Sequence, residues 1–499
     1  MYNLLLQAVV IPIFASVLVY LSAGKLGKRV GWIAFASLLY TTLLLVYVGS
    51  QTFNGGQVQE TYPWVASVGL SFGFLADGLS LPVAAVMNLV LLATTVYSMP
   101  YMEKRIRGIY DKDDRRAYGI YYLSFLLLSV GLVGIALSTN LIELYLFLEL
   151  VLIPTFVIIS FFGYSDKERV AITYFIWNHL GAFLFLGGIA LVFAASGSFE
   201  ISAMAGLSSS PYAAWIVGLI LVGWLVKMAV FGVHMWLPLT EAEPPTALAA
   251  TMAVVAGVGN YVLVRLLVLG MPTVFQWFSL PLMALAVFTM FYGGALTLAQ
   301  TDVKYLFAWS TVSQNAYSVL GIASLTVLGV SGGVFYFLSH IMGKFILFSI
   351  AGILLTQTGL RDIRSMGGLA SKMPLTATIA LIGTLILSAV PPTSGFQAEW
   401  IMFAGIFFHG AVGSSSYLAV AFLGLIATVF TVAYTFWPFR RIFFGSLPSA
   451  LEGVREAPLT MTLPLLAVAA ISIVIGIYPD LITKFLIPYV NNLPLGGGR

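Results

Sequence analysis

The chain has 499 residues, of which 60% are hydrophobic and only 8% are charged, and its mean hydropathy is +1.00. A soluble domain carries roughly 25% charged residues, so this composition indicates a polytopic membrane protein. The chain contains no cysteine, which excludes disulfides and cysteine-ligated iron–sulfur clusters. The pI near 9.0 does not indicate nucleic-acid binding, because no basic run alternates with aromatic residues.

Hydrophobic stretches long enough to cross a bilayer recur throughout the chain. A transmembrane helix needs roughly 20 predominantly apolar residues. By this measure the sequence predicts an all-α polytopic protein with fourteen transmembrane segments. They lie at residues 3–23, 31–50, 79–101, 117–137, 139–162, 169–196, 213–237, 246–269, 277–299, 304–325, 328–357, 374–410, 416–439 and 459–479.

The lysines and arginines lie mainly on one side of this arrangement. The loops that contain Lys25, Lys112 and Arg361 are on that side, whereas the predicted loops on the opposite side contain no lysine or arginine. Because cytoplasmic loops are enriched in these residues, both termini are predicted to face outward, with Lys484 and Arg499 in the C-terminal tail. We expect a cell membrane, rather than an organellar one, as the location.

Six charged residues fall inside the predicted segments, apart from Arg169 and Lys304 at the first positions of theirs. An isolated charge at the bilayer centre costs about 3 kcal/mol, so several of them in one bundle indicate a functional path. A structural ion pair is the alternative for any single one. The six residues are Glu143, Glu149, Lys227, Arg265, Lys344 and Glu399.

Helix-breaking residues accompany three of these charges. The stretch "GVHMWLP" follows Lys227, "SHIMGK" ends at Lys344, and "PPTSGFQAEW" contains Glu399. Backbone that is not helical is tolerated at membrane depth where it is buried or lines a wet cavity. Breaks at corresponding places in two halves indicate inverted repeats around an ion path near the midplane. We therefore expect two five-helix repeats in which the seventh and twelfth helices are broken, and a break beside Lys344 in the eleventh.

This pattern divides the chain into four regions. Residues 1–111 hold the first three helices, 112–270 the first repeat, 271–445 the second repeat, and 446–499 the last helix and the tail.

Several stretches resemble a known family. They are "FLELVLIPTFVII", "VKMAVFGVHMWLPLTEAEPPTA", "TDVKYLFAWSTVSQNAYSVLGI", "SHIMGKFILFSIAG" and "PPTSGFQAEWIMF". The chain is similar, over about residues 70–440, to the antiporter-like subunits of respiratory complex I and of multisubunit cation/proton antiporters. "RDIRSMGGLASKMP", and Glu399 where other members tend to have lysine, are most similar to the M-type subunit, chain 4 of complex I.

The resemblance implies a proton-translocating subunit of a redox pump of the NADH:quinone oxidoreductase type, with no catalytic centre, cofactor or metal in this chain. Iron–sulfur clusters and quinone are expected in partner subunits. Besides lipids and protons, the expected partners are L-type, N-type and K-type membrane subunits and a peripheral redox arm. The family pairs a glutamate and a lysine at positions that match Glu149 and Lys227. A buried lysine loses its proton readily unless a carboxylate holds its charge, so Glu149 is expected to control Lys227.

The expected relay continues from Lys227 through His234 and water. His234 lies seven residues after Lys227, on the same helical face and roughly 10 Å along the axis; a capping or packing role at the break is its alternative. His340 and Lys344, four residues apart on one face, come next, and Glu399 is expected to be the outermost group.

Two positions depart from the family pattern. Gly257 stands where the M-type family usually has lysine, and Gln314 stands where it has histidine. Neither side chain titrates, so water or Lys344 is expected to carry that part of the path.

The remaining ionisable residues receive simpler interpretations. We expect Glu143 to have a structural role, either paired with a neighbouring subunit or near the outer surface. His179 is expected to form a hydrogen bond across the bundle, with a relay role as the alternative, and Arg265 to extend to the outer interface. His409 is either an exit group near Glu399 or a solvated interfacial residue. Glu241 and Glu243 are either proton-gathering groups or part of a solvated loop.

Three alternatives compete with the redox pump. They are a subunit of a multisubunit sodium/proton antiporter, a membrane-arm subunit of a membrane-bound hydrogenase, and a purely structural scaffold. The sequence does not choose the electron donor or the transported ion.

Overall fold

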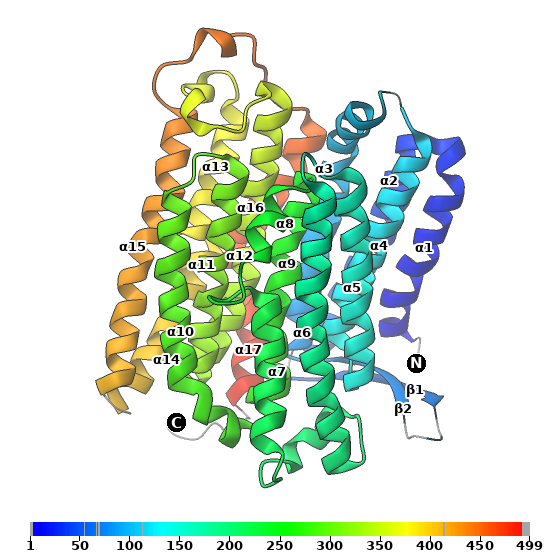
Figure 1. The fold of residues 1–499 in the computed structure, drawn as a ribbon, viewed down its shortest axis with the longest axis vertical. Helices are drawn as coiled ribbons and strands as arrows, with labels where there is room; N and C mark the ends of the chain where they lie inside the picture. Colours follow the sequence, from blue (N-terminus) through cyan, green and yellow to red (C-terminus); the bar gives the residue numbers. More distant parts are fainter. Residues whose placement is uncertain are drawn as a thin grey trace.

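The computed structural model describes residues 3–53, 55–65, 67, 70–111, 113–412 and 415–491. Lys112 and Arg499 lie outside the described residues. Most helices run side by side along the long axis of the molecule (Figure 1). In chain order they are α1 (Leu4–Leu26), α2 (Gly31–Thr52), α3 (Ser80–Tyr110), α4 (Arg115–Leu137), α5 (Leu141–Phe162), α6 (Lys167–Ser196), α7 (Ala213–Met228), α8 (Trp236–Ala242), α9 (Thr246–Val262), α10 (Pro272–Leu298), α11 (Val303–Ala323), α12 (Val327–Thr358), α13 (Pro374–Leu387), α14 (Ser394–Val412), α15 (Ser415–Phe443), α16 (Leu459–Ile477) and α17 (Asp480–Asn491).

Shorter elements connect these helices. The π-helix η4 (Leu263–Val268) continues α9. Short 3-10 helices lie at Gly27–Val30, Ile201–Gly206, Ile363–Ser365, Leu369–Ser371 and Ser449–Leu451.

Each of the fourteen predicted segments lies on a helix or on two consecutive helical pieces. Within the described part of the chain, ten helical stretches are long and apolar enough to cross a membrane, with α1 and α2 counted as one stretch. α7 and α13 are apolar but shorter, because each is the first half of a broken helix. The breaks predicted in the seventh and twelfth segments are therefore confirmed.

The break predicted beside Lys344 is wrong. α12 runs without interruption through Gly343 and Lys344. Gly343 packs against Ile386 and Leu387 of α13, where a Cβ would lie 2.9 to 3.0 Å from their side chains. The glycine therefore allows two helices to approach closely, and it does not interrupt the hydrogen bonds of its own helix.

The chain is not entirely α-helical, because a β-hairpin lies between α2 and α3. Strands β1 (Val58–Val65) and β2 (Leu70–Ala76) pair antiparallel. The Glu60 carboxylate accepts hydrogen bonds from the Leu5 and Leu6 N–H groups at 2.9 Å each, which satisfies two of the donors that the first turn of α1 leaves free. The hairpin thus closes one end of the molecule beside the start of α1 (Figure 1).

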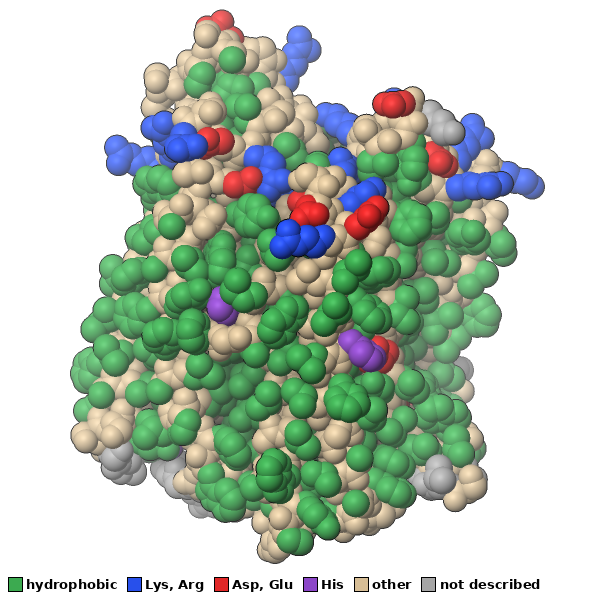
Figure 2. Space-filling model, in the orientation of Figure 1, with side chains coloured by type: hydrophobic (Ala, Val, Ile, Leu, Met, Phe, Trp, Pro, Cys, Tyr) green, Lys and Arg blue, Asp and Glu red, His purple; other side chains and the backbone are tan. Residues whose placement is uncertain are grey.

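The opposite end carries the basic loops. Lys28 forms an ion pair with Glu103 at 2.8 Å, Lys104 donates to Thr356 O, and Arg441 donates to Arg364 O. Most of the charged side chains on the visible face gather toward this end, and hydrophobic side chains cover the middle (Figure 2). This distribution is typical of a protein whose middle faces lipid.

α7 and α13 end in the same way. Ala229 directly follows the end of α7, and Ala389 lies two residues after the end of α13. Their φ angles are 55° and 51°, in a region of backbone conformation that favours glycine. The same backbone hydrogen bonds follow in both places. After α7, the N–H groups of residues 229, 230 and 233 donate to the carbonyl oxygens of residues 226, 225 and 230. After α13, the N–H groups of residues 389, 390 and 393 donate to the carbonyl oxygens of residues 386, 385 and 390. The first two bonds of each set form a Schellman motif.

A second backbone pattern also occurs twice. Residues 139 and 141 form a bridge with 199 and 201 beside the hairpin, and residues 301 and 303 form the same bridge with 361 and 363 among the basic loops. A shift of 162 residues carries the first bridge onto the second. The bridges lie at opposite ends of the molecule, which is the arrangement that an inverted repeat produces.

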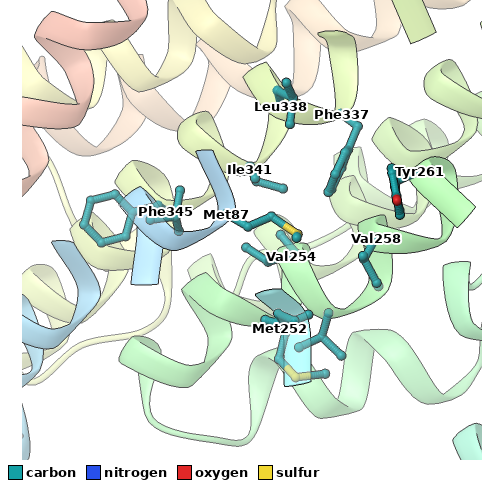
Figure 3. Close-up of a cluster of buried hydrophobic side chains, with 14 of the residues drawn as sticks. Met87, Met252, Val254, Val258, Tyr261, Phe337, Leu338, Ile341 and Phe345 are labelled. Atoms are coloured by element: carbon teal, nitrogen blue, oxygen red, sulfur yellow. The ribbon is translucent and has the colours of Figure 1, made fainter. Parts of the chain in front are cut away.

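A tightly packed apolar layer lies where α3, α9 and α12 meet (Figure 3). α9 packs against α3 and α12, and Figure 3 shows the side chains of this layer in close-up. Its labelled members are Met87 of α3, Met252, Val254, Val258 and Tyr261 of α9, and Phe337, Leu338, Ile341 and Phe345 of α12.

Candidate functional site

Lys227 lies in the last turn of α7 and is only 4% exposed. α7 stops one residue later because Ala229 adopts the left-handed conformation. The indole N–H of Trp236 donates to Val226 O at 2.9 Å, which holds α8 against the end of α7. Lys227 Nζ donates to Asn178 Oδ1 of α6 at 3.3 Å. The lysine is therefore held by a neutral amide.

Glu149 lies on α5 and approaches the next residue of α6. Its Oε1 is 3.5 Å from His179 Nδ1, and the two side chains are 22% and 51% exposed. No N–O distance of 4.0 Å or less joins Glu149 to Lys227, both of which lie in the described part of the chain. Asn178 thus contacts the expected lysine and the neighbouring His179 lies beside the expected carboxylate, while the charge of Glu149 acts on Lys227.

His234 is buried in the segment between α7 and α8, with 3% exposure. Because the helix breaks at Ala229, the helical spacing expected between Lys227 and His234 does not apply. The ring lies among three aromatic rings, with centroid distances of 5.7 Å to Phe231, 5.1 Å to Tyr292 and 5.7 Å to Trp309. Neither ring nitrogen has a hydrogen-bond partner among the described residues, so both are free to meet water.

Lys344 and His340 lie one turn apart on α12 and are fully or nearly fully buried. Lys344 Nζ donates to Phe307 O of α11 at 2.6 Å and also to Ser310 Oγ. His340 Nε2 has no hydrogen-bond partner in the described part of the structure. The expected proximity of these two groups on one helical face is therefore confirmed by the continuous α12.

Glu241 and Glu243 are buried, with exposures of 0% and 4%, so the solvated-loop interpretation is wrong. Glu243 Oε1 accepts from the Asp166 N–H at 2.9 Å, which ties the α8–α9 connection to the start of α6. Glu241 Oε2 accepts from Thr311 Oγ1 at 2.6 Å. The α8 helix turns back into the bundle after the break, and for this reason both carboxylates are inside.

Lys304 is also buried, although it lies at the end of the molecule that carries the basic loops. It lies in the first turn of α11, where Nζ donates to Pro244 O at 2.5 Å and lies 4.7 Å from the centre of the Tyr164 ring. This lysine holds the α8–α9 connection onto α11.

Glu399 lies on α14 and is half-buried. Its charge acts on three buried tyrosines, Tyr317, Tyr336 and Tyr434. Gln314 joins two of these: its Nε2 donates to Tyr434 Oη at 2.7 Å, and its Oε1 accepts from Tyr336 Oη at 2.7 Å. The glutamine therefore orders the hydroxyl groups around Glu399 and does not leave a gap.

Gly257 faces a filled space. A Cβ at this position would lie 2.5 Å from Phe337 Cε2. The ring of Phe337 thus occupies the volume that a larger side chain on α9 would need, and the adjoining apolar layer is visible in Figure 3.

Three other sequence interpretations are tested by contacts. Arg265 does not extend to the interface: it is 6% exposed and donates to both Asp77 oxygens at 2.8 Å. Glu143 is also fully buried, and its Oε2 accepts from the Gly73 N–H at 3.2 Å beneath the hairpin. His409 Nδ1 lies 2.5 Å from Ser324 O at the α11–α12 turn, and its ring lies tilted against that of Tyr417 on α15 with the centroids 4.2 Å apart.

Together these features define a class: a polytopic helical membrane protein with lysines, histidines and glutamates buried in its interior, several of them beside broken helices. The chain belongs to the family described as NADH:quinone oxidoreductase/Mrp antiporter, TM, whose model matches residues 138–431.

Two relatives and one structure illustrate the match. The chain is 29% identical to one of the subunits of the Na(+)/H(+) antiporter of Alkalihalophilus pseudofirmus over 93% of this chain, but it spans only 60% of that relative's length. It is 30% identical to the NAD(P)H-quinone oxidoreductase chain 4 2 of Microcystis aeruginosa over 88% of this chain and 78% of the relative. One chain in the structure of respiratory complex I from Thermus thermophilus with bound NADH has the same fold, with a TM-score of 0.86, 23% identity, and coverage of 99% of this chain and 100% of that one.

Proposed function

We propose that this chain is a proton-translocating M-type subunit of a redox-driven pump of the complex I type. The observation that carries the proposal is the position of Lys227, which is buried at a helix break and bound to the neutral Asn178, while Glu149 lies 3.5 Å from the neighbouring His179. A lysine in apolar surroundings releases its proton unless a negative charge is near. Movement of the Glu149 carboxylate toward Lys227 would hold the proton, and its return to His179 would release it.

In the proposed relay, protons pass between Lys227 and Glu399 through groups in the second half. His234 and water follow Lys227, His340 and Lys344 follow His234, and Glu399 is the last carboxylate. The free nitrogens of His234 and His340 support this order, because each can exchange a proton with water without losing an existing bond. Gln314, at the position where the family has a histidine, binds the hydroxyl groups of Tyr336 and Tyr434 and so orders them near Glu399.

We propose fourteen membrane crossings, ten of which form two inverted five-helix repeats at residues 112–270 and 271–445. The doubled Schellman motifs and the doubled backbone bridges support this division. Both termini then lie on the outer side of a cell membrane, since the basic loops lie at the other end.

The partners are proposed from the exposure of Glu149 and His179. A carboxylate that is 22% exposed beside a histidine that is 51% exposed would face lipid in an isolated chain, and polar groups are costly there. A neighbouring membrane protein that covers this face would remove the cost. L-type, N-type or K-type membrane subunits would cover this face, and we propose that a peripheral arm holds the iron–sulfur clusters and the quinone site, so that the chain itself needs no cofactor.

A sodium/proton antiporter is the second candidate. The match of 93% of the chain to one of the subunits of such an antiporter favours it. A membrane-bound hydrogenase and a structural scaffold use the same fold, but neither has a specific contact in its favour.

The composition of the native complex separates these functions. The complex that contains this chain is purified from its membrane, its subunits are identified, and it is reconstituted in liposomes. Co-purified iron–sulfur subunits together with electron-driven acidification support the redox pump. Absence of redox subunits together with sodium-driven proton movement supports the antiporter, and a complex that moves no protons contradicts both.

A further inference from the structure

The two halves of the molecule place different residues at one matching position. α5 and α11 each follow an N-cap side chain, Asn140 or Asp302, that accepts bonds from the N–H groups two and three residues later. Counted from these caps, Glu149 and Thr311 are both the ninth residue. Thr311 therefore occupies in the second half the helical position that Glu149 occupies in the first.

A carboxylate reaches that position from another helix. Glu241 of α8 accepts from Thr311 Oγ1 at 2.6 Å and is fully buried. Its other oxygen, Oε1, is buried and has no hydrogen-bond partner among the described residues. A buried carboxylate oxygen without a partner is costly, so an uncommitted oxygen here indicates a group that accepts something further.

Lys344 supplies the cation. Its Nζ donates to Ser310 Oγ and to Phe307 O, and Ser310 directly precedes Thr311 on α11. The charges of Glu241 and Lys344 act on each other across this part of α11. The other ionisable group that acts on Lys344 is His340, one turn away on α12, and Phe348 covers the remaining side at 5.7 Å.

We propose that Glu241 and Lys344 form a second buried carboxylate–lysine pair, in which Glu241 controls the protonation of Lys344 as Glu149 is proposed to control that of Lys227. This inference rests on the proposed proton-translocating function. The pair exchanges one proton: an ionised carboxylate and an ammonium become a carboxylic acid and a neutral amine when the proton leaves Nζ for Glu241. The net charge of the pair is zero in both states, so the exchange buries no additional charge.

The second pair also gives a physical role to the sequence at Gly257. Phe337 fills the space beside Gly257, so α9 cannot supply a lysine to the centre of the bundle. Lys344 supplies one from α12, and Glu241 supplies its counter-charge from α8.

Glu241→Gln in the whole complex tests the pair. Glutamine retains an oxygen that accepts from Thr311, so a purely structural hydrogen bond survives the change while the charge is lost. We expect a loss of protons moved per electron in liposomes with assembly intact. Glu241→Gln/Thr311→Glu should restore proton movement, because it returns a carboxylate to the position that matches Glu149. Glu103→Gln, at a glutamate paired with Lys28 and Arg107 near the basic loops, is the control and should match the wild type.

The outcomes separate the two proposals. If Glu241→Gln pumps as the wild type does while Lys227→Met does not, the second pair is wrong and the proposed function stands. If the wild-type complex moves no protons, the proposed function itself fails. If Glu241→Gln does not assemble, Glu241→Gln/Lys344→Met decides: its assembly supports a charge pair, because both charges are then removed, and its failure to assemble overturns the pair.

Discussion

Asn178 and His179 are consecutive on α6 and bind the two members of the expected pair separately. Asn178 Oδ1 accepts from Lys227 at 3.3 Å, and His179 Nδ1 lies 3.5 Å from Glu149 Oε1. Lys227 and Glu149 are thus not in direct contact, although the charge of Glu149 acts on Lys227. The proposed switch requires the Glu149 carboxylate to move from His179 toward Lys227.

Asn178→Asp would place a fixed carboxylate beside Lys227. An opposite charge at this distance raises the proton affinity of the lysine about tenfold or more. We therefore expect fewer protons moved per electron at an unchanged or slower electron-transfer rate. Asn178→Ser, which keeps an uncharged oxygen, is the control and should pump. Normal pumping by Asn178→Asp would show that proton release from Lys227 does not limit the path.

Gln314→Leu would remove the only acceptor that Tyr336 Oη has in the described structure. A buried hydroxyl without a partner costs roughly 1–3 kcal/mol, whereas Tyr434 keeps its bond from Thr431. We expect lower thermal stability in detergent for Gln314→Leu, and recovery in Gln314→Leu/Tyr336→Phe. A double variant as unstable as Gln314→Leu alone would contradict this interpretation of the network.

Gly257→Ala would force a methyl group against Phe337. Overpacking of this kind costs about 1–3 kcal/mol, so the melting temperature of the purified protein should fall. Gly218→Ala is the matched control, because a Cβ there meets no heavy atom within 4 Å. Equal stability of the two variants would show that Phe337 moves aside freely.

Asp77→Asn would remove the counter-charge of the buried Arg265. Breaking a buried ion pair costs about 3–5 kcal/mol. Burial by itself would raise the pKa of Asp77, but the charge and hydrogen bonds of Arg265 outweigh this effect and lower the pKa to about 2. The carboxylate therefore stabilises the fold fully above its unfolded pKa of about 3.9, and this contribution is lost as pH falls toward 2.

The stability difference between wild type and Asp77→Asn should accordingly be constant between about pH 5 and 8 and narrow below about pH 4. Thermal unfolding in detergent at stepped pH measures it. Asp362→Asn, in an exposed pair with Arg364, should change stability little. A difference that grows as pH falls would contradict the assignment.

The sequence predicted the helices and the two breaks because hydropathy and helix-breaking residues are local signals. The motifs around Glu149, Lys227 and Glu399 also located the candidate residues before any contact was known. The hairpin β1–β2 was missed because its strands are short and lie between long apolar segments. α17 was missed because only contacts such as that of Tyr489 with Arg265 fix its place.

The errors share a tertiary cause. Glu241 and Glu243 follow a proline and resemble a polar loop, but α8 folds back into the bundle and buries them. Gly343 resembles a helix breaker, but it lies within the continuous α12 and allows α13 to pack closely against that helix. Asn178 and Thr311 carry no charge and lie within helices, so no sequence signal distinguished them from ordinary polar residues.

The most direct test of the account is the number of protons moved per electron by the whole complex in liposomes with Lys227→Met. Methionine preserves the volume and removes the charge, and Lys484→Met, on the half-exposed lysine of α17, is the matched control. The account predicts a drop for Lys227→Met, with the complex assembled and still transferring electrons, and no change for Lys484→Met. Unchanged pumping by Lys227→Met would contradict it, because Lys227 would then be a structural charge.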